Sequence, residues 1–176
     1  MALALIIGCA GEPRNEMADT APETGSQAAA DVEEDGTVLM LGTRLTAGLG
    51  LQPEDAYPAL IQERIDSAGL PFRVINAGVS GETSAGALRR LDWLMRQEFD
   101  LLLLETGAND MLRGMDLDST RVNIQRIIDR VREERPQATI VLAGMMAPPN
   151  LGREYAEAYG RMYVKLAEQN NLPFIP

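Results

Sequence analysis

Short aliphatic runs alternate with longer stretches of helical hydrophobic spacing from residue 37 to the end of the chain. The aliphatic runs predict four strands, at residues 37–41, 72–75, 100–105 and 138–143. Residues 173–176 open a fifth strand, which we expect to be truncated together with the helix after it. The third run, DLLLLE, is almost entirely apolar, which is typical of a strand with both faces covered. Strands that alternate with helices predict βαβ units. We therefore expect an α/β fold, a three-layer α/β/α sandwich with a parallel, flavodoxin-like sheet.

Four helices are expected between these strands, because apolar residues recur there three and four positions apart. Pro58 suits the first turn of the first helix, and Gly69 ends that helix. Thr83 or Ser84 can supply the N-cap of the second. The predicted apolar faces are Tyr57, Leu60, Ile61 and Ile65 in the first helix; Leu88, Leu91, Leu94 and Met95 in the second; Ile124, Ile127, Ile128 and Val131 in the third; and Tyr155, Tyr159, Met162, Tyr163 and Leu166 in the fourth.

Residues 10–36 differ from the rest of the chain in composition. They carry eight acidic residues and one arginine, and few large apolar groups. Such a segment cannot bury enough apolar surface to order itself, so we expect a disordered acidic linker. The folded domain is then residues 37–176.

The start of the chain, residues 1–9, is a short apolar run that ends at Gly8 and Cys9. It resembles the end of a bacterial lipoprotein signal, in which the cysteine is acylated. This resemblance implies a partial signal, membrane anchoring through Cys9 and a periplasmic protein on the outer membrane of a Gram-negative bacterium, since Ala10 and not an aspartate follows. The alternative is an incidental cysteine near the chain start.

Composition excludes several function classes. Most of the formal charge of −10 lies in the linker, and the domain has no basic stripe, so nucleic acid is not an expected partner. The single cysteine permits no intrachain disulfide. The chain has no histidine, which removes the usual general base and the commonest metal ligand. We expect no metal and no cofactor.

Polar residues and glycines gather where four of the predicted strands end, at residues 42–46, 76–81, 106–110 and 144–150. Ligands of doubly wound sheets bind outside the carboxyl ends of the strands. The candidate site therefore lies at this edge.

Three of these segments, Leu41–Gly48, Ile75–Thr83 and Gly107–Asp110, resemble the first three signature blocks of the SGNH (GDSL-type) hydrolases. The segment Met145–Gly152 is similar to the loop after the fourth strand in bacterial arylesterases and in the periplasmic thioesterase/lysophospholipase subgroup. The resemblance covers about residues 37–176. It implies a hydrolase fold and hydrolysis of a small carboxylic ester or thioester.

The resemblance also implies roles for individual residues. In the family a serine after the first strand attacks the acyl carbonyl, a histidine takes its proton and an aspartate orients the histidine. The nucleophile position is Arg44, and the oxyanion-hole positions are Gly78 and Asn109. The neighbouring motif residues are Gly42, Thr43, Gly107 and Asp110. Taken alone, Gly78 equally fits a turn glycine, and Asn109 a capping residue.

The chain departs from the family pattern at its chemical centre. Where the family has Gly-Asp-Ser-Leu, this chain has Gly42-Thr43-Arg44-Leu45. A guanidinium stays protonated and has no lone pair for attack. The family's last block, Asp-x-x-His, does not occur before Pro176. We therefore expect this chain to be catalytically inactive.

Three interpretations of Arg44 remain open. The chain can be a partial or frame-shifted copy of an active esterase, since paired indels turn Asp-Ser codons into Thr-Arg codons. It can be a pseudo-enzyme whose acyl pocket binds an anionic lipid, with Arg44 at the mouth. It can also be a fragment with an exposed sheet edge and no stable fold, because the domain would lack its last strand and helix.

Other polar groups near the site have simpler interpretations. Ser80 and Thr46 are expected to serve as turn or cap residues. The carboxylates of Glu82, Glu105 and Asp110 could form an acid–base pair, but nothing in the sequence selects one of them. Met145 and Met146 are expected to line the core or a groove.

Overall fold

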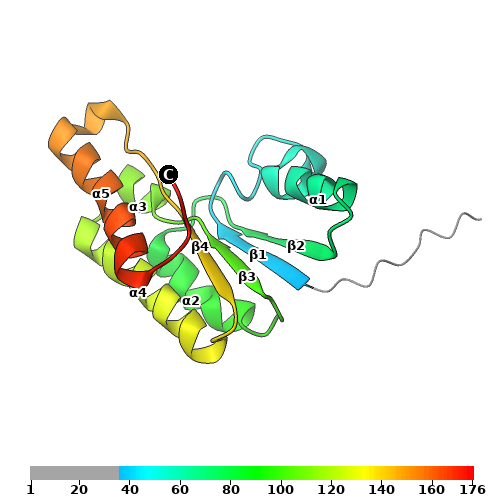
Figure 1. The fold of residues 1–176 in the computed structure, drawn as a ribbon. Helices are drawn as coiled ribbons and strands as arrows, with labels where there is room; N and C mark the ends of the chain where they lie inside the picture. The colour runs from blue at the N-terminus through cyan, green and yellow to red at the C-terminus, as the bar shows by residue number, and fades with distance from the viewer. Residues whose placement is uncertain (1–35) are drawn as a thin grey trace, which may run out of the picture. The chain divides into compact units, whose positions relative to one another are not determined.

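A computed structural model describes residues 36–176, so Cys9 and the predicted linker up to residue 35 lie outside the described residues. Five parallel strands form one sheet in the order β2-β1-β3-β4-β5 (Figure 1). The order and direction confirm the predicted α/β class with a flavodoxin-like sheet. The strands are β1 (Gly36–Gly42), β2 (Phe72–Gly78), β3 (Leu101–Leu104), β4 (Thr139–Ala143) and β5 (Phe174–Ile175).

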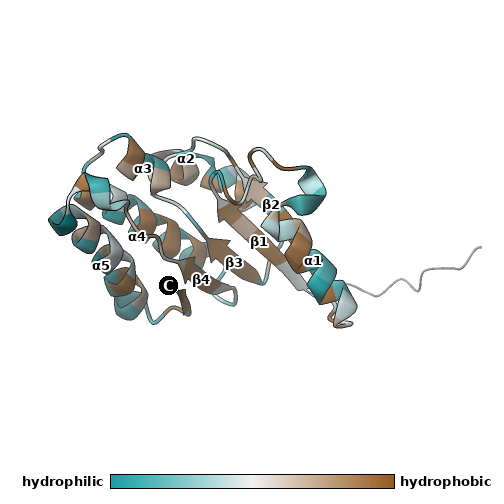
Figure 2. Ribbon diagram, turned by 90° about the horizontal axis from the view of Figure 1, so that it is seen from above, coloured by the Kyte–Doolittle hydropathy of each residue, from teal (hydrophilic) through white to brown (hydrophobic). Residues whose placement is uncertain are grey.

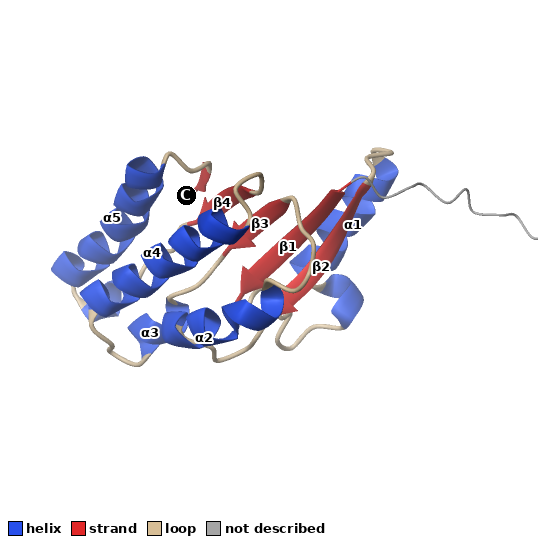
Figure 3. Ribbon diagram, turned by 90° about the horizontal axis from the view of Figure 1, so that it is seen from below, coloured by secondary structure: helices blue, strands red, loops and turns tan. Residues whose placement is uncertain are grey.

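Five α-helices connect and flank the strands (Figure 3): α1 (Tyr57–Ser67), α2 (Ser84–Leu94), α3 (Ala108–Leu112), α4 (Leu117–Glu134) and α5 (Arg153–Asn170). Two short 3-10 helices, η1 (Pro53–Asp55) and η2 (Pro149–Leu151), lie in loops. The four long helices confirm the prediction. The short ones were not predicted, because three to five residues are too few to show a periodicity. No helix in the described part of the chain is both long and apolar enough to span a bilayer.

Local signals place the helix ends. Thr83 caps α2, since its hydroxyl accepts a hydrogen bond from the Gly86 N–H. Pro58 occupies the first turn of α1, where no N–H donor is needed. Gly69, with φ of 64°, follows the end of α1 in the left-handed conformation. These boundaries therefore follow from sequence alone.

Helices α2, α4 and α5 cover one face of the sheet, and α1 lies on the other (Figures 1 and 2). The main core lies between the sheet and the three-helix layer. Its strand residues alternate along each strand, as the two-residue period requires. They include Leu39, Leu41, Leu102, Leu104, Ile140 and Leu142. The predicted apolar faces of α2, α4 and α5 pack against this core.

The opposite face of the sheet is only partly covered. Leu101 and Leu103 of β3 and Val141 of β4 point to this face and are partly exposed. The prediction that residues 100–105 are covered on both sides is therefore wrong for the described residues, because α1 packs against β2 at the edge of the sheet and not against β3. The predicted apolar face of α1 is also incompletely buried, since Leu60 is 45% exposed.

Candidate functional site

The candidate site lies at the carboxyl edge of the sheet, where the loops after β1, β2, β3 and β4 meet. The strand register confirms this arrangement, because Gly42 at the end of β1 is opposite Gly78 at the end of β2, and Leu41 is opposite Leu104 of β3. The three signature segments, which are far apart in sequence, therefore start at one level of the sheet.

Thr43 and Arg44 follow β1, and their side chains differ in burial. Thr43 is buried, and its N–H and hydroxyl donate to the carboxylate of Glu105 over 2.7 and 2.8 Å. Arg44 is exposed, and its side chain makes no hydrogen bond or ion pair within residues 36–176. The position predicted for the nucleophile thus holds a solvent-facing cation.

Glu105 organises the loop after β1. Besides Thr43, it accepts a hydrogen bond from the Thr46 hydroxyl over 2.8 Å, although Glu105 itself is only 7% exposed. Thr46 also bonds the hydroxyl of Tyr57, at 2.9 Å. Sequence reasoning noted Glu105 as a carboxylate near the site but missed this structural role. The only signal was an acidic residue directly after the most apolar strand.

Gly78 is fixed by close packing. A side chain at this position would overlap the backbone of Thr46 and Ala47, so only glycine allows this approach between the loops. Its N–H donates to the side-chain oxygen of Asn76 over 2.9 Å. The donor that an oxyanion hole would use is therefore already engaged in this structure. The packing supports the interpretation of Gly78 as a glycine required for backbone shape.

Asn109 is buried at the start of α3, and Gly107 forms the N-cap of that helix with φ of 112°. The Asn109 side-chain amide donates to the carbonyl of Glu82 over 2.9 Å. This bond ties the loop after β3 to the loop after β2. It uses one of the two amide hydrogens, so the second can serve a ligand.

Asp110 has a structural role. Its carboxylate accepts hydrogen bonds from the N–H and hydroxyl of Ser84 over 2.7 and 2.5 Å, and it is 1% exposed. The Thr120 hydroxyl lies 3.4 Å away on the same carboxylate. Asp110 therefore joins α3 to the starts of α2 and α4. The expected cap is Thr83, and Ser84 bonds to Asp110 instead.

The tyrosines of α5 are core residues, as predicted, and also support the loop after β3. Tyr163 donates to the carbonyl of Thr106 over 2.7 Å and packs so closely on Gly107 that no side chain fits there. Burial raises the pKa of Tyr159 to about 12 and that of Tyr163 well above its ordinary value. Both phenols are thus neutral at physiological pH and act as hydrogen-bonding core groups.

The two methionines after β4 differ. Met145 packs on the core and accepts a weak hydrogen bond from the Tyr159 hydroxyl at 3.7 Å. Met146 is 91% exposed. The expectation of core or groove lining is therefore met by Met145 and is wrong for Met146, because the loop after β4 turns this side chain away from the core.

The arrangement offers hydrogen-bond donors, and the three carboxylates beside them all make structural contacts. Glu105 and Asp110 accept hydrogen bonds from neighbouring loops, and Glu82 pairs with Arg90 at 2.7 Å. No group of three or more acidic or sulfur ligands that could hold a metal occurs within residues 36–176. The proposed acid–base pair of carboxylates gains no support, since each is committed to a structural contact.

The GDSL-like lipase/acylhydrolase family matches residues 40–176 of the chain. The chain belongs to this family. Esterase TesA of Pseudomonas aeruginosa is 38% identical over 141 residues, which are 80% of this chain and 69% of that protein. Thioesterase 1/protease 1/lysophospholipase L1 of Escherichia coli K12 is 35% identical over 141 residues, covering 80% of this chain and 65% of that protein.

Solved structures agree with the family assignment. The SGNH-hydrolase family esterase AlinE4 superposes with a TM-score of 0.76 at 35% identity, covering 80% of this chain and 75% of that one. The TesA crystal structure superposes with a TM-score of 0.74 at 38% identity, covering 78% of this chain and 76% of that one. The predicted resemblance is confirmed, and the scaffold is that of an ester or thioester hydrolase. The roles of Arg44, Gly78 and Asn109 within it remain predictions.

Proposed function

We propose that this polypeptide is a non-hydrolysing member of the GDSL-like family, built on a scaffold for carboxylic ester and thioester hydrolysis. The observation that carries the proposal is Arg44, exposed at the end of β1 where the family pattern has serine. A permanently protonated guanidinium cannot form an acyl-enzyme intermediate. In a comparable triad, loss of the serine alone lowers kcat by roughly 10⁶-fold.

No neighbouring group replaces the missing chemistry. The 176 residues contain no histidine, so no imidazole can activate a hydroxyl. The Ser84 hydroxyl is bonded to Asp110, and the Thr43 and Thr46 hydroxyls are bonded to Glu105. These hydroxyls are buried and hold loops together. Ser80 is exposed but has no base beside it among the described residues.

A second candidate function is ligand binding without turnover. The second amide hydrogen of Asn109 can still donate a hydrogen bond to a carbonyl or carboxylate oxygen, and the exposed Arg44 favours an anionic group at the mouth of the site. In this reading the protein binds an acyl ligand or an anionic lipid. The resemblance of residues 1–9 to a lipoprotein signal supports a place at the periplasmic face of a membrane.

The test of the first candidate compares the 176-residue chain with the double variant T43D/R44S, using short p-nitrophenyl esters with and without added imidazole. We expect the parent to match the buffer rate in both conditions. The double variant should respond to imidazole, because the added base can activate the restored serine. The same variant carrying N109A should lose that response, and thermal melts verify that each variant folds.

One outcome would overturn the proposal. It is saturable ester hydrolysis by the parent chain that disappears in the single variant N109A. The frame-shift interpretation has its own test in the gene. Independently supported codons for Thr43 and Arg44 in an unshifted frame exclude it.

Membrane anchoring has a separate test in cells. The full chain expressed with a complete signal upstream should incorporate radiolabelled palmitate, and the variant C9S should not. Equal labelling of both chains would contradict acylation at Cys9.

A further inference from the structure

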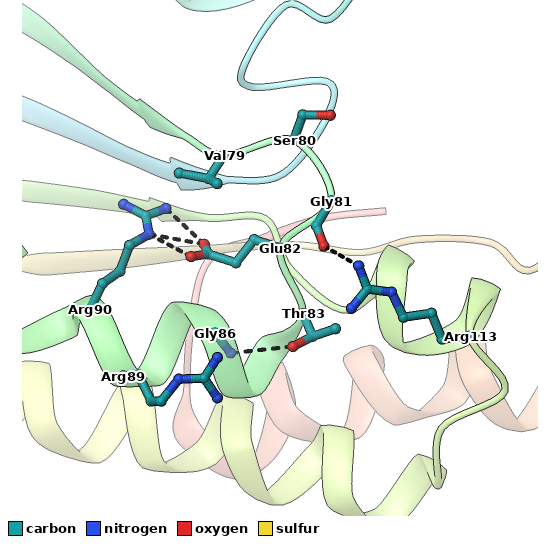
Figure 4. Close-up of a pocket in the computed structure, with 9 residues that line it drawn as sticks. All are labelled: Val79, Ser80, Gly81, Glu82, Thr83, Gly86, Arg89, Arg90 and Arg113. Carbon is teal, nitrogen blue, oxygen red and sulfur yellow. Dashed lines mark hydrogen bonds and ion pairs between the residues drawn. The ribbon is translucent and has the colours of Figure 1, made fainter.

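A cavity of about 400 Å³ opens beside the candidate site, where the loop after β2 meets the start of α2 (Figure 4). Residues 79–83 form one wall. Arg89 and Arg90 project from α2, and Arg113 reaches in from the end of α3. Three arginines and one carboxylate therefore line a small space at the edge of the sheet.

The charges in this cavity do not cancel. Glu82 accepts three hydrogen bonds from the guanidinium of Arg90, at 2.7, 2.8 and 3.0 Å, so this pair is neutral. Arg113 donates to the carbonyl of Gly81 over 2.8 Å and meets no carboxylate among the described residues. Arg89 is exposed and makes no hydrogen bond or ion pair within residues 36–176. Two uncompensated guanidinium groups remain.

The N-terminus of α2 adds little to the attraction of these guanidinium groups for an anion. Thr83 already caps the Gly86 N–H, and Asp110 accepts the Ser84 N–H. The positive end of the helix is thus largely satisfied. In Figure 4 the side chains of Arg89 and Arg113 lie on either side of Thr83. Any anion in the cavity would be held by these two side chains.

Hydrogen bonds tie two residues that line the cavity, Glu82 and Arg113, to Asn109, a predicted oxyanion-hole residue. The carbonyl of Glu82 accepts the Asn109 side chain, and the Arg113 N–H donates to the Asn109 carbonyl over 3.1 Å. An apolar side chain also lines the cavity, since Val79 is among its lining residues and is 42% exposed. A ligand with one anionic group and one apolar chain matches this combination.

We propose that Arg89 and Arg113 form a subsite for the phosphate group of a single-chain amphiphile. Guanidinium forks match phosphate oxygens in geometry and give charge-assisted hydrogen bonds. The acyl part of the ligand lies toward Asn109. This assignment of the ligand rests on the acyl site of the proposed function, whereas the phosphate subsite itself does not depend on turnover.

The experiment measures binding by calorimetry with three probes: a 1-O-alkyl glycerol 3-phosphate below its micelle concentration, the same alkylglycerol without phosphate, and inorganic phosphate. The ether linkage prevents hydrolysis. The variants are R89Q/R113Q and the matched control R64Q/R96Q, which removes two exposed arginines away from the cavity. Thermal melts verify that both fold.

We expect the parent to bind the alkyl phosphate, and R89Q/R113Q to bind it about tenfold or more weakly. R64Q/R96Q should match the parent, and the alkylglycerol should bind equally to all three chains. Higher salt should weaken only the phosphate-dependent part. Inorganic phosphate that binds as tightly as the alkyl phosphate would identify a free-phosphate site and remove the amphiphile from the proposal.

Two results would overturn the subsite. One is alkyl phosphate binding that is equal in the parent and in R89Q/R113Q, or equally weakened in R64Q/R96Q. The other is no binding of either phosphate probe to the folded parent. If the alkylglycerol binds and its phosphate derivative binds no more tightly, the proposed acyl-binding function is retained and the phosphate subsite is rejected. If the parent hydrolyses esters while the ether probes behave as expected, the non-hydrolysing proposal fails and the subsite stands.

Discussion

The carboxylate of Glu105 holds Thr43 by two hydrogen bonds, one from the backbone N–H at 2.7 Å and one from the hydroxyl at 2.8 Å. This pair fixes the residue directly before the position predicted for the nucleophile. The exposed Arg44 therefore follows a residue that is anchored to the end of β3.

Replacing Glu105 by alanine should destabilise the fold strongly. The change leaves the buried Thr43 N–H without its acceptor and removes the bond to Thr46. We expect the free energy of unfolding to fall by about 3 kcal/mol, measured by urea denaturation. The control E63A removes an exposed carboxylate and should change it by less than about 0.5 kcal/mol. Similar effects of both changes would contradict the role of Glu105.

Adjacent leucines of β3 should respond differently to truncation. Leu102 is fully buried on the helix-covered face, whereas Leu103 is partly exposed on the other face. We expect Leu102→Ala to cost about 3 kcal/mol of unfolding free energy and Leu103→Ala about 1 kcal/mol. Equal costs for the two variants would mean that another segment or a second copy covers the open face.

Stability should fall in alkaline solution because of the tyrosines. Burial raises the pKa of Tyr159 to about 12 in the folded state, above the ordinary value of 10.0. The folded state therefore retains this proton where the unfolded state loses it. The stabilisation is complete below about pH 10 and is lost as pH rises through about 12.

The measurement is the free energy of unfolding as a function of pH, together with the near-ultraviolet absorbance of tyrosinate. The variant Y159F should lose less stability between pH 10 and 12 than the parent, because it lacks the titrating group. Tyrosinate from Tyr159 forming near pH 10 while the chain remains folded would be inconsistent with this account.

Alanine at two glycines should have opposite effects. At Gly78 a side chain would overlap the backbone of Thr46 and Ala47, so G78A should destabilise the fold by about 2 kcal/mol and displace the loop after β1. At Gly160, within α5, open space surrounds the added carbon, so G160A should stabilise by about 0.5 kcal/mol. Thermal melts of the two variants check both signs. If G78A leaves the stability unchanged, the loop after β1 can move to accommodate the added carbon.

The sequence by itself determined where the long helices and strands lie and which residue types the candidate site holds. Hydrophobic period and turn residues are local properties, so the strands and the ends of α1 and α2 could be placed from them. Arg44 and the absence of histidine are facts of composition, and no fold can change a guanidinium into a nucleophile.

Only the tertiary structure decided how the polar groups are engaged. Glu105 and Thr43 are 62 residues apart, and only the pairing of β1 with β3 brings the carboxylate to the loop. The hydrogen bond from the Gly78 N–H to the Asn76 side chain joins two residues that are close in the sequence. Nothing in the sequence pattern indicates that these two groups meet. The open face of β3 also could not be predicted, because an apolar run indicates only that a strand can be buried. Which neighbours bury it depends on the packing of distant elements.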